Sequence, residues 1–501
     1  MNEEPERSTS APTTASPWLT LIGLGADGAA GLTEAVRALI ADAEWVVGGA
    51  RHLQLVESLI TGQSLAWSSP LTSTLPELLA LRGRRVVVLA SGDPFFYGVG
   101  TLLRRHLSAA EIHCIPHPSS VALAAARLGW TQQACATVSL AGRPLTSLRP
   151  ALHPGRGLFV LSADAKTPGE VAQALIEWGF GASEITILER LGGPDEAMKR
   201  YSAAALANAA PAPDFAPLNL MAIAVEAERS ARILASAPGL PDDWFEHDGQ
   251  ITKREVRAVT LSSLRPQHGQ VLWDIGCGSG SIAIEWLLAH PSTQAVAFER
   301  DPERAARAQR NAVELGVPRL VVRTGSAPQC LDDFLDHFLA DSASAASSAP
   351  SASSASSNSS TVWSTGSAAF TASTAATGLS NTPTDLSIES PVGGPVGWPL
   401  PDAIFLGGGL RDLTLIEKSW ELLPVGGRLV ANAVVLETEQ LLFAAWQRYG
   451  GQLTRFGCER LDRVGTLHAF RPTMRVLQWV AEKNSGLPTV PGPSAGGKRK
   501  A

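Results

Sequence analysis

The stretch VLWDIGCGSGSIAIEW, residues 271–286, decides the fold of the second half of this 501-residue chain. An apolar run ends at Asp274, glycines follow at alternate positions (Gly276, Gly278 and Gly280), and a helical pattern closes the stretch. Glycine is needed where the backbone turns sharply and a ligand approaches without a Cβ in the way. A helix N-terminus beside such a turn attracts polar groups of a ligand. The stretch therefore predicts a strand, a ligand-binding loop and a helix.

An acid lies where a nucleoside ligand would need one. Glu299 ends the next predicted strand, residues 294–299, 19 residues after Gly280. A carboxylate at this edge of a parallel sheet can accept hydrogen bonds from both hydroxyls of a ribose. The dinucleotide fingerprint is spaced GxGxxG, whereas this loop reads GxGxG. We favour an adenosine cofactor with one ribose over a dinucleotide, or over a glycine turn that binds nothing.

DIGCGSG together with Glu299 resembles the class I S-adenosylmethionine-dependent methyltransferases. The resemblance implies that the glycine loop holds the methionine part of the cofactor and that the acid holds the ribose. The cofactor-binding positions that it implies are Asp274, Gly276, Gly278, Gly280, Glu299, Gly325 and Ser326. Ser326 departs from the family, which often has an acid there for the adenine amino group.

The first half alternates apolar strands with helical patterns, which is typical of an α/β domain. The expected strands are residues 18–25, 84–91, 157–162, 184–189 and 218–226, and the expected helices include 33–43 and 168–179. Three loops, GLGADG (23–28), ASGDPFFYG (90–98) and IPHPSSVALAAARLG (115–129), each begin at the end of an apolar run. From the residues alone, they are either one crevice at the carboxyl edge of a sheet or ordinary strand-to-helix turns.

These three loops resemble the tetrapyrrole methylases, the class III methyltransferases, which enclose S-adenosylmethionine between two α/β subdomains. The positions that match the family's motifs are Gly23, Gly25, Ser91, Gly92, Asp93, Phe96, Ser119 and Ser120. Ala26 stands where the family usually has proline.

The sequence segments around the second glycine loop resemble a more specific family. Segments 239–264, 325–331, 405–409 and 432–439 resemble the C-terminal half of the decarboxylating precorrin methyltransferases of cobalamin biosynthesis. That family implies methylation of carbon 5 of a tetrapyrrole by the first domain. The second domain would methylate carbon 15 and remove carbon dioxide from the acetate on carbon 12. We expect Asp248, Thr252, Asn432 and Glu437 to face the latter chemistry as catalytic residues.

The predicted fold class is α/β, with an N-terminal class III methyltransferase of two subdomains and a C-terminal Rossmann-like class I methyltransferase. We expect a disordered tail (1–17), a tetrapyrrole methylase domain (18–228), a linker (229–240), a class I domain (241–482) and a second tail (483–501). Ser, Ala and Thr make up 30 of the 38 residues from Asp341 to Gly378. Such composition does not bury enough apolar surface to fold, so residues 341–398 are expected to be an insertion in the class I domain.

Composition limits the partners. A net charge of −6 argues against non-specific binding to the phosphate backbone of a nucleic acid. The five cysteines form no CxxC pair, and no apolar run reaches the length of a membrane span, so we expect a cytoplasmic protein. The family resemblance implies a small tetrapyrrole substrate, and we expect a homo-oligomer. His113 and His117 flank Pro116 without helical geometry, and no metal is expected. The alternatives are a fused pair whose C-terminal half modifies RNA or protein, and a protein that binds S-adenosylmethionine without turnover.

Basic residues are needed to receive the substrate's carboxylates. The candidates, each of which is otherwise a solvated charge, are Arg190, Lys253, Arg254, Arg257 and Arg411. In the helix expected over residues 252–264, we assign the stripe Val256, Val259 and Leu264 to the core.

Overall fold

The computed structural model describes residues 17–327, 329, 331 and 400–484. The predicted insertion 341–398, residues 1–16 of the first tail and residues 485–501 of the second lie outside the described residues. The chain divides into two compact units: Met1–Leu145 with Ala151–Arg232, and Thr146–Pro150 with Ile233–Ala501. Each unit is described by itself.

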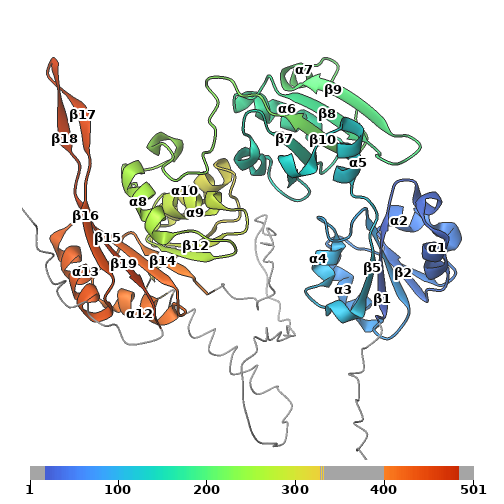
Figure 1. Ribbon diagram of the computed structural model, residues 1–501, viewed down its shortest axis with the longest axis horizontal. Helices are drawn as coiled ribbons and strands as arrows, with labels where there is room; N and C mark the ends of the chain where they lie inside the picture. Colours follow the sequence, from blue (N-terminus) through green and yellow to red (C-terminus); the bar gives the residue numbers. More distant parts are fainter. Residues whose placement is uncertain (1–16, 328, 330, 332–399, 485–501) are drawn as a thin grey trace, which may run out of the picture. The chain divides into compact units, whose positions relative to one another are not determined.

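The first unit begins with a fully parallel five-stranded sheet in the order β3-β2-β4-β1-β5 (Figure 1). Its strands are β1 (Leu19–Leu24), β2 (Trp45–Gly48), β3 (Gln63–Ala66), β4 (Val86–Ser91) and β5 (Ile112–Ile115). Its helices are α1 (Glu34–Ala41), α2 (Ala50–Leu55), α3 (Leu75–Ala80) and α4 (Val99–Leu103). Apolar clusters pack on both faces of the sheet, as a parallel sheet requires.

The second sheet of this unit is mixed, in the order β6-β7-β10-β8-β9. Among its neighbouring strands, β6 and β7 pair in parallel and the other three pairs are antiparallel. Its strands are β6 (Cys135–Ser139), β7 (Gly157–Leu161), β8 (Glu184–Glu189), β9 (Ala197–Ser202) and β10 (Asn219–Ala224), with helices α5 (Ser120–Leu128), α6 (Thr167–Glu177) and α7 (Ala203–Ala207). Two sheets, one parallel and one mixed, confirm the two predicted α/β subdomains.

The second unit holds a seven-stranded sheet in the order β13-β12-β11-β14-β15-β19-β16. The five strands from β13 to β15 are parallel, and β19 runs antiparallel to both of its neighbours. The strands are β11 (Val271–Ile275), β12 (Gln294–Glu299), β13 (Val321–Thr324), β14 (Ala403–Leu406), β15 (Arg428–Ala433), β16 (Gln452–Phe456) and β19 (Val476–Glu482). The helices are α8 (Arg254–Leu264), α9 (Ser281–Ala289), α10 (Pro302–Glu314), α12 (Thr414–Leu422) and α13 (Leu436–Tyr449).

Strand order reverses at β11, which lies between β12 and β14. In open α/β sheets, ligands bind outside the carboxyl ends of the strands at such a switch point. The predicted Rossmann-like arrangement is confirmed. Its glycine loop follows β11, the strand at the switch point.

A two-stranded hairpin, β17 (Glu459–Val464) and β18 (Leu467–Pro472), interrupts the path from β16 to β19. No predicted strand covered it. No helix of the described residues is long and apolar enough to cross a bilayer.

The expected core stripe of α8 is wrong in part. Val259 is 40% exposed, and the buried face consists of Arg257, Thr260, Leu261 and Leu264. An apolar stripe is the usual buried face of a helix. Here the buried face carries an arginine and a threonine, because both side chains have hydrogen-bond partners beneath the helix.

Candidate cofactor and substrate sites

The glycine loop after β11 has the geometry that only glycine adopts readily. Gly276, Gly278 and Gly280 have φ angles of +75°, +57° and +76°. A Cβ on Gly276 would lie 2.8 Å from the carbonyl oxygen of Gly408, in the loop after β14. The loop is therefore kept open by the absence of side chains.

The carboxyl edges of three strands supply the acids and amides of this cradle. Glu299 ends β12 and accepts hydrogen bonds from the amides of Gly278 (2.9 Å) and Asp301 (3.0 Å). Gly325, directly after β13, donates its amide to the Glu299 carbonyl oxygen at 2.9 Å. Ser326 is exposed. The structure thus brings the predicted cofactor residues of this unit to one edge of one sheet.

Asp274 is the buried acid of the loop. Its Oδ2 accepts the amide of Ala283 at 3.1 Å, while its Oδ1 is buried and has no hydrogen-bond partner. Burial raises the pKa of Asp274 from 3.8 to about 7; the Ala283 amide opposes the rise and the charge of Glu299 adds to it. Ser279 Oγ is a second buried atom without a partner. Buried polar atoms without partners are rare, so the cradle fits a ligand that brings its own polar groups.

A segment before α8 is fastened beside this loop. Asn311 of α10 donates to the carbonyl oxygens of Ser279 (2.9 Å) and Glu246 (3.0 Å) and accepts the Glu246 amide at 2.8 Å. One buried amide therefore joins the glycine loop to residue 246. Nothing in the sequence pattern singled out Asn311, because its partners lie 32 and 65 residues away.

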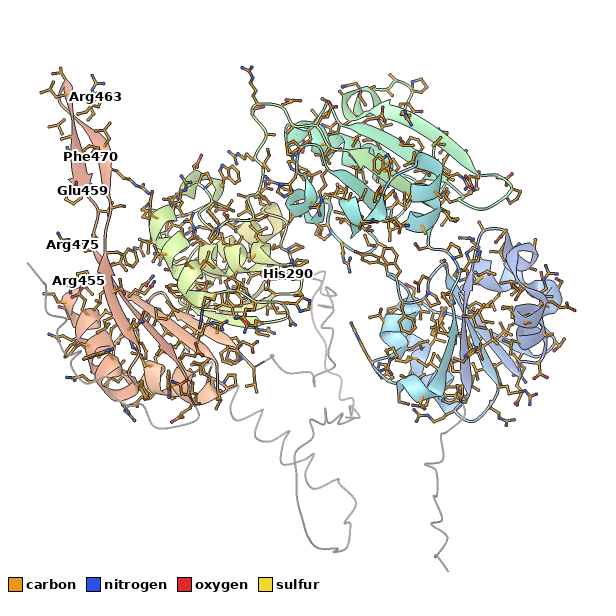
Figure 2. All side chains as sticks on the ribbon, viewed as in Figure 1. His290, Arg455, Glu459, Arg463, Phe470 and Arg475 are labelled. Atoms are coloured by element: carbon orange, nitrogen blue, oxygen red, sulfur yellow. The ribbon has the colours of Figure 1, made fainter. Side chains whose placement is uncertain are left out.

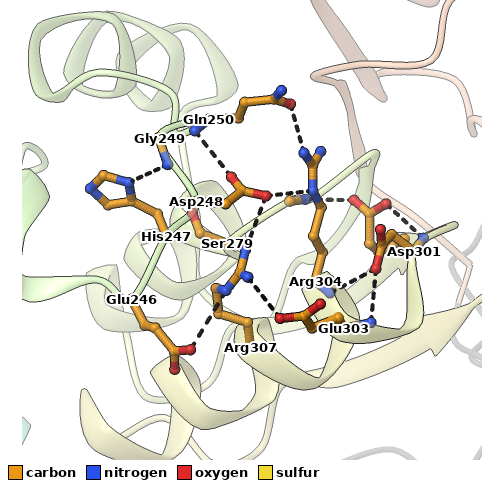
Figure 3. Close-up of polar contacts among 12 residues, drawn as sticks. Glu246, His247, Asp248, Gly249, Gln250, Ser279, Asp301, Glu303, Arg304 and Arg307 are labelled. Atoms are coloured by element: carbon orange, nitrogen blue, oxygen red, sulfur yellow. Dashed lines mark hydrogen bonds and ion pairs between the residues drawn. The ribbon is translucent and has the colours of Figure 1, made fainter.

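Asp248, a predicted catalytic residue, lies in an ion-pair network with α10 (Figure 3). Its Oδ2 is 2.8 Å from Arg304 Nε and 3.2 Å from Arg307 Nη1. The backbone amide of Gln250, together with the two guanidinium groups, lowers the pKa of Asp248. Its carboxylate is therefore charged and held in ion pairs with two arginines. This arrangement suits a residue that positions the segment before α8 better than one that transfers a proton.

The other predicted catalytic residues occupy different places. Asn432 of β15 donates to Thr260 Oγ1 (2.9 Å) and accepts from Gln478 Nε2 (2.9 Å). Thr252 gives its carbonyl oxygen to Arg257 Nη1 at 2.5 Å. Glu437 is exposed in the first turn of α13, and among the described residues no hydrogen bond or ion pair joins it to the other three. The structure places Asn432 at the carboxyl edge of the sheet but does not gather all four side chains.

Arg257 is not available to receive substrate carboxylates, which corrects that expectation. Its side chain is fully buried, and it pairs with Glu285 at 2.7 Å and Asp242 at 2.8 Å. It also donates to the carbonyl oxygen of Leu240 and lies over the ring of Phe245. It fixes the segment before α8 to α8 and α9.

In the first unit, the ends of β1, β4 and β5 are joined through backbone groups. Gly92 donates its amide to the Leu24 carbonyl oxygen at 3.0 Å and accepts the His117 amide at 3.2 Å. A Cβ on Gly23 would overlap the carbonyl oxygen of Gly92. Three loops that are far apart in sequence thus meet at one edge of the sheet, and whether they enclose a ligand stays a prediction.

Several polar side chains of these three loops already have hydrogen-bond partners. Ser91 Oγ lies 2.8 Å from His52 Nε2, Asp93 Oδ1 accepts the Phe95 amide at 2.9 Å, and Ser119 caps α5 by accepting the Ala122 amide at 3.1 Å. The remaining predicted positions also lie here: Gly25 beside the ring of His117, Phe96 38% exposed, and Ser120 in the first turn of α5.

The sequence pattern did not single out two further polar side chains of this part of the unit. Asp27 Oδ1 and His52 Nδ1 are buried without a partner, and burial is the largest cause that lowers the pKa of His52. Asp27 lies within GLGADG, so its position in the loop was the available signal. His52 lies on α2, outside any glycine loop, and had none. Among the described residues, no group of three or more His, Cys, Asp or Glu could hold a metal ion.

A parallel sheet joined to a mixed sheet in one unit, and a Rossmann-like sheet with a glycine loop at its switch point in the other, define the chain as a fusion of two methyltransferase folds, class III and class I. Residues 19–207 match the family described as tetrapyrrole (corrin/porphyrin) methylases. Residues 243–337 and 389–483 match the precorrin methyltransferase domain.

The chain is 44% identical over 472 residues to a precorrin-6Y C(5,15)-methyltransferase [decarboxylating] of Sinorhizobium sp, covering 94% of this chain and 98% of the relative. The chain belongs to the family of decarboxylating precorrin-6Y C(5,15)-methyltransferases.

Two shorter relatives carry single activities in their names. A cobalt-precorrin-7 C(5)-methyltransferase of Salmonella typhimurium is 31% identical, over 36% of this chain and 87% of the relative. A probable cobalt-precorrin-6B C(15)-methyltransferase (decarboxylating) of Saccharolobus solfataricus is 28% identical, over 42% of this chain and 78% of the relative.

Proposed function

We propose that this chain methylates precorrin-6Y at carbons 5 and 15 and removes carbon dioxide from the acetate on carbon 12, in cobalamin biosynthesis. The observation that carries the proposal is the 44% identity along nearly the whole of both chains. The geometry supports it, since both units have a glycine loop at the carboxyl ends of parallel strands.

We assign the two methylations to different units. The first unit, with its tetrapyrrole methylase fold, would act on carbon 5, and the second on carbon 15 and on the acetate. Separate relatives named for a C(5) and for a decarboxylating C(15) activity support this division. Each unit would then hold its own S-adenosylmethionine, which gives two cofactor sites per chain.

S-adenosylmethionine supplies an activated methyl group on its sulfonium, so positioning accounts for most of the acceleration. In the second unit, Gly276, Gly278 and Gly280 would leave room for the methionine chain, and Glu299 would accept the ribose hydroxyls. In the first unit, the cofactor would lie at the ends of β1, β4 and β5, where Gly23 approaches the Gly92 carbonyl oxygen and Ser91 and Asp93 would contact it. Ser326 offers a hydroxyl where the family often has an acid.

Decarboxylation requires few further groups from the protein. When the carbon–carbon bond to the carboxylate breaks, its electron pair passes into the conjugated macrocycle, and a proton is later added. The protein must shield the carboxylate from water and control that proton. We place Asn432, which Thr260 and Gln478 hold in one orientation, at this step. Thr252 and Glu437 remain candidates, and Asp248 is proposed to position the segment.

Calorimetric titration of the full chain with S-adenosylhomocysteine tests the two-site proposal. We expect two sites per chain, with Asp93→Ala removing one and Glu299→Gln the other. Glutamine is chosen because Glu299 also accepts two loop amides. Asp195→Asn and Glu421→Gln, both exposed, are the matched controls. A single site in the wild type, or loss of both sites in one variant, would contradict the proposal.

A methyl-labelling assay with the tetrapyrrole, read by mass spectrometry, tests the reaction itself. We expect two labelled methyl groups and the loss of one carboxylate per product. If Glu437→Ala and Thr252→Ala keep methylation at carbon 15 and decarboxylation intact, neither residue is catalytic. Label on RNA or protein instead of the tetrapyrrole would favour a different modifying enzyme, and no transfer at all would leave only binding.

We further propose that the enzyme works in the cytoplasm as a homo-oligomer without nucleic acid. The net charge of −6 supports the last point.

A further inference from the structure

His52 belongs to α2, which together with α1 covers one face of the parallel sheet of the first unit (Figure 1 and Figure 2). Leu53 and Leu55 of the same helix pack on the apolar cluster of this face. His52 instead reaches the end of β4, where its Nε2 lies 2.8 Å from Ser91 Oγ. The helix thus places an imidazole beside a serine at the carboxyl ends of the parallel strands.

The other ring nitrogen, Nδ1, is buried and has no hydrogen-bond partner. It lies on the side of Gly49, where a Cβ would be 3.4 Å from it. Burial lowers the pKa of His52, and the charge of Arg51 lowers it further, so the ring is neutral at neutral pH. A neutral imidazole carries one N–H and one free lone pair. One nitrogen of His52 is therefore a donor and the other an acceptor.

The surroundings of the ring select which nitrogen carries the proton. A buried N–H without a partner is rarer in proteins than a buried acceptor with an unfilled lone pair. Since Nδ1 is the nitrogen without a partner, it keeps the lone pair. The proton therefore belongs on Nε2, which donates to Ser91 Oγ.

This tautomer fixes the role of the Ser91 hydroxyl. Its oxygen accepts from His52, so its single hydrogen has to be donated elsewhere. Among the described residues, Ser91 Oγ makes no other hydrogen bond, and the side chain is exposed. The hydroxyl hydrogen is therefore offered to a ligand at this edge of the sheet.

We propose that His52 is a positioning residue of the first unit: it holds Ser91 Oγ so that the serine hydroxyl donates to a carboxylate of a bound ligand. The proposal rests on the proposed function of this unit, because S-adenosylmethionine and the tetrapyrrole both carry carboxylates. Hydrogen bonds to an ionised acceptor are shorter and about twice as strong as those between neutral groups. A hydroxyl that is held as a donor before the ligand arrives loses less entropy on binding.

Three substitutions at residue 52 distinguish a donor from a base. Glutamine offers an amide N–H near the place of Nε2, glutamate offers only acceptors, and leucine offers neither. His52→Gln should stay within about threefold of the wild type, whereas His52→Leu should bind the ligand about 10- to 100-fold more weakly. His52→Glu should lose at least as much, because its carboxylate takes the Ser91 hydrogen and repels the carboxylate of the ligand.

Two measurements identify the ligand that supplies the carboxylate. Calorimetry of the full chain gives its affinity for S-adenosylhomocysteine, and the kinetics of methyl transfer to carbon 5 give the KM for the tetrapyrrole. A weaker affinity for S-adenosylhomocysteine in His52→Leu assigns the carboxylate of the cofactor. A higher KM for the tetrapyrrole, with that affinity unchanged, assigns a carboxylate of the substrate.

Ser91→Ala removes the donor itself from an exposed position and should give the same loss as His52→Leu. The double variant should lose nothing more, because the two side chains act as one unit. His106→Leu, which replaces an exposed histidine of the same unit, is the matched control and should behave as the wild type does.

Nitrogen-15 NMR of the histidine-labelled full chain tests the tautomer directly. The proton of His52 should be on Nε2, and the signal is assigned by its absence from His52→Gln. This spectrum does not depend on turnover, so it tests the proposal even in a chain that transfers no methyl group.

Four outcomes would overturn the proposal. They are a proton on Nδ1, wild-type affinity and KM in His52→Leu, additive losses in the double variant, and a His52→Gln variant that loses kcat while His52→Glu keeps it. The last pattern is that of a general base. A wild-type chain that leaves carbon 5 unmethylated contradicts the proposed function of the unit instead. Thermal unfolding of each variant checks that its fold is retained.

Discussion

Replacing Asp274 with asparagine should stabilise the second unit at neutral and alkaline pH. Asp274 is fully buried, one of its oxygens has no partner, and its pKa in the folded chain is about 7 against an ordinary 3.8. Between these values the folded state holds a proton that the unfolded state has released, so this group makes unfolding easier as the pH rises. The shift of about 3 pKa units corresponds to about 4 kcal/mol. Asparagine has nearly the same shape and carries no charge at any pH.

The free energy of unfolding of Asp274→Asn, minus that of the wild type, should therefore grow by up to about 4 kcal/mol between pH 4 and pH 8. The slope should be about 1.4 kcal/mol per pH unit in the middle of this range and should flatten above pH 7. The difference isolates Asp274 because other titrating groups are common to both chains. Hydrogen exchange of peptides from residues 271–286, corrected for intrinsic exchange, reports this unit alone.

Asp243→Asn is the control, since Asp243 is an exposed aspartate of the same unit. Its difference from the wild type should not vary with pH by a comparable amount. A pH-independent difference for Asp274→Asn would refute the reasoning and would mean that water or a counter-charge reaches the carboxylate.

Three further substitutions follow from the same geometry. Gly23→Ala should abolish S-adenosylhomocysteine binding in the first unit and leave the second site intact, because the added methyl overlaps the Gly92 carbonyl oxygen; calorimetry measures this, and two remaining sites would contradict it. Arg257→Ala should cost about 3–5 kcal/mol in urea unfolding, since it leaves the buried Glu285 without its cation; a loss below 1 kcal/mol would show that water replaces the guanidinium. Asn311→Ala should weaken cofactor binding in the second unit, as it frees the loop at Ser279; unchanged affinity with lowered stability would make Asn311 purely structural.

Strand positions were readable because the buried strands are short apolar runs. The strands expected at 184–189 and 294–299 match β8 and β12 residue for residue. The glycines of the second loop were readable for a related reason, since a loop that needs positive φ leaves glycine at each such position. Their role in binding the cofactor stays a prediction.

Other features depend on long-range contacts that no local pattern carries. Arg307 and Asn311 belong to the buried residues of α10. In the sequence they look like solvated polar residues, because nothing local shows the partners that they find. Arg257 was expected either to receive a substrate carboxylate or to be a solvated charge, because charged residues are rarely buried, and its partner Glu285 is 28 residues away. The hairpin of β17 and β18 escaped notice because its strands, ERLDRV and LHAFRP, have neither an apolar run nor a regular alternation of apolar and polar residues.

The glycine cradles have a consequence for inheritance. A site built from the absence of side chains has no conservative replacement, because every substitution at Gly23 or Gly276 adds atoms where backbone oxygens already lie. Random mutation therefore damages these positions in one step and restores them only by exact reversion. Since the two cradles lie in separate units, lineages should more often lose one methyl transfer than both, and a half-modified tetrapyrrole would be the chemical trace of such decay.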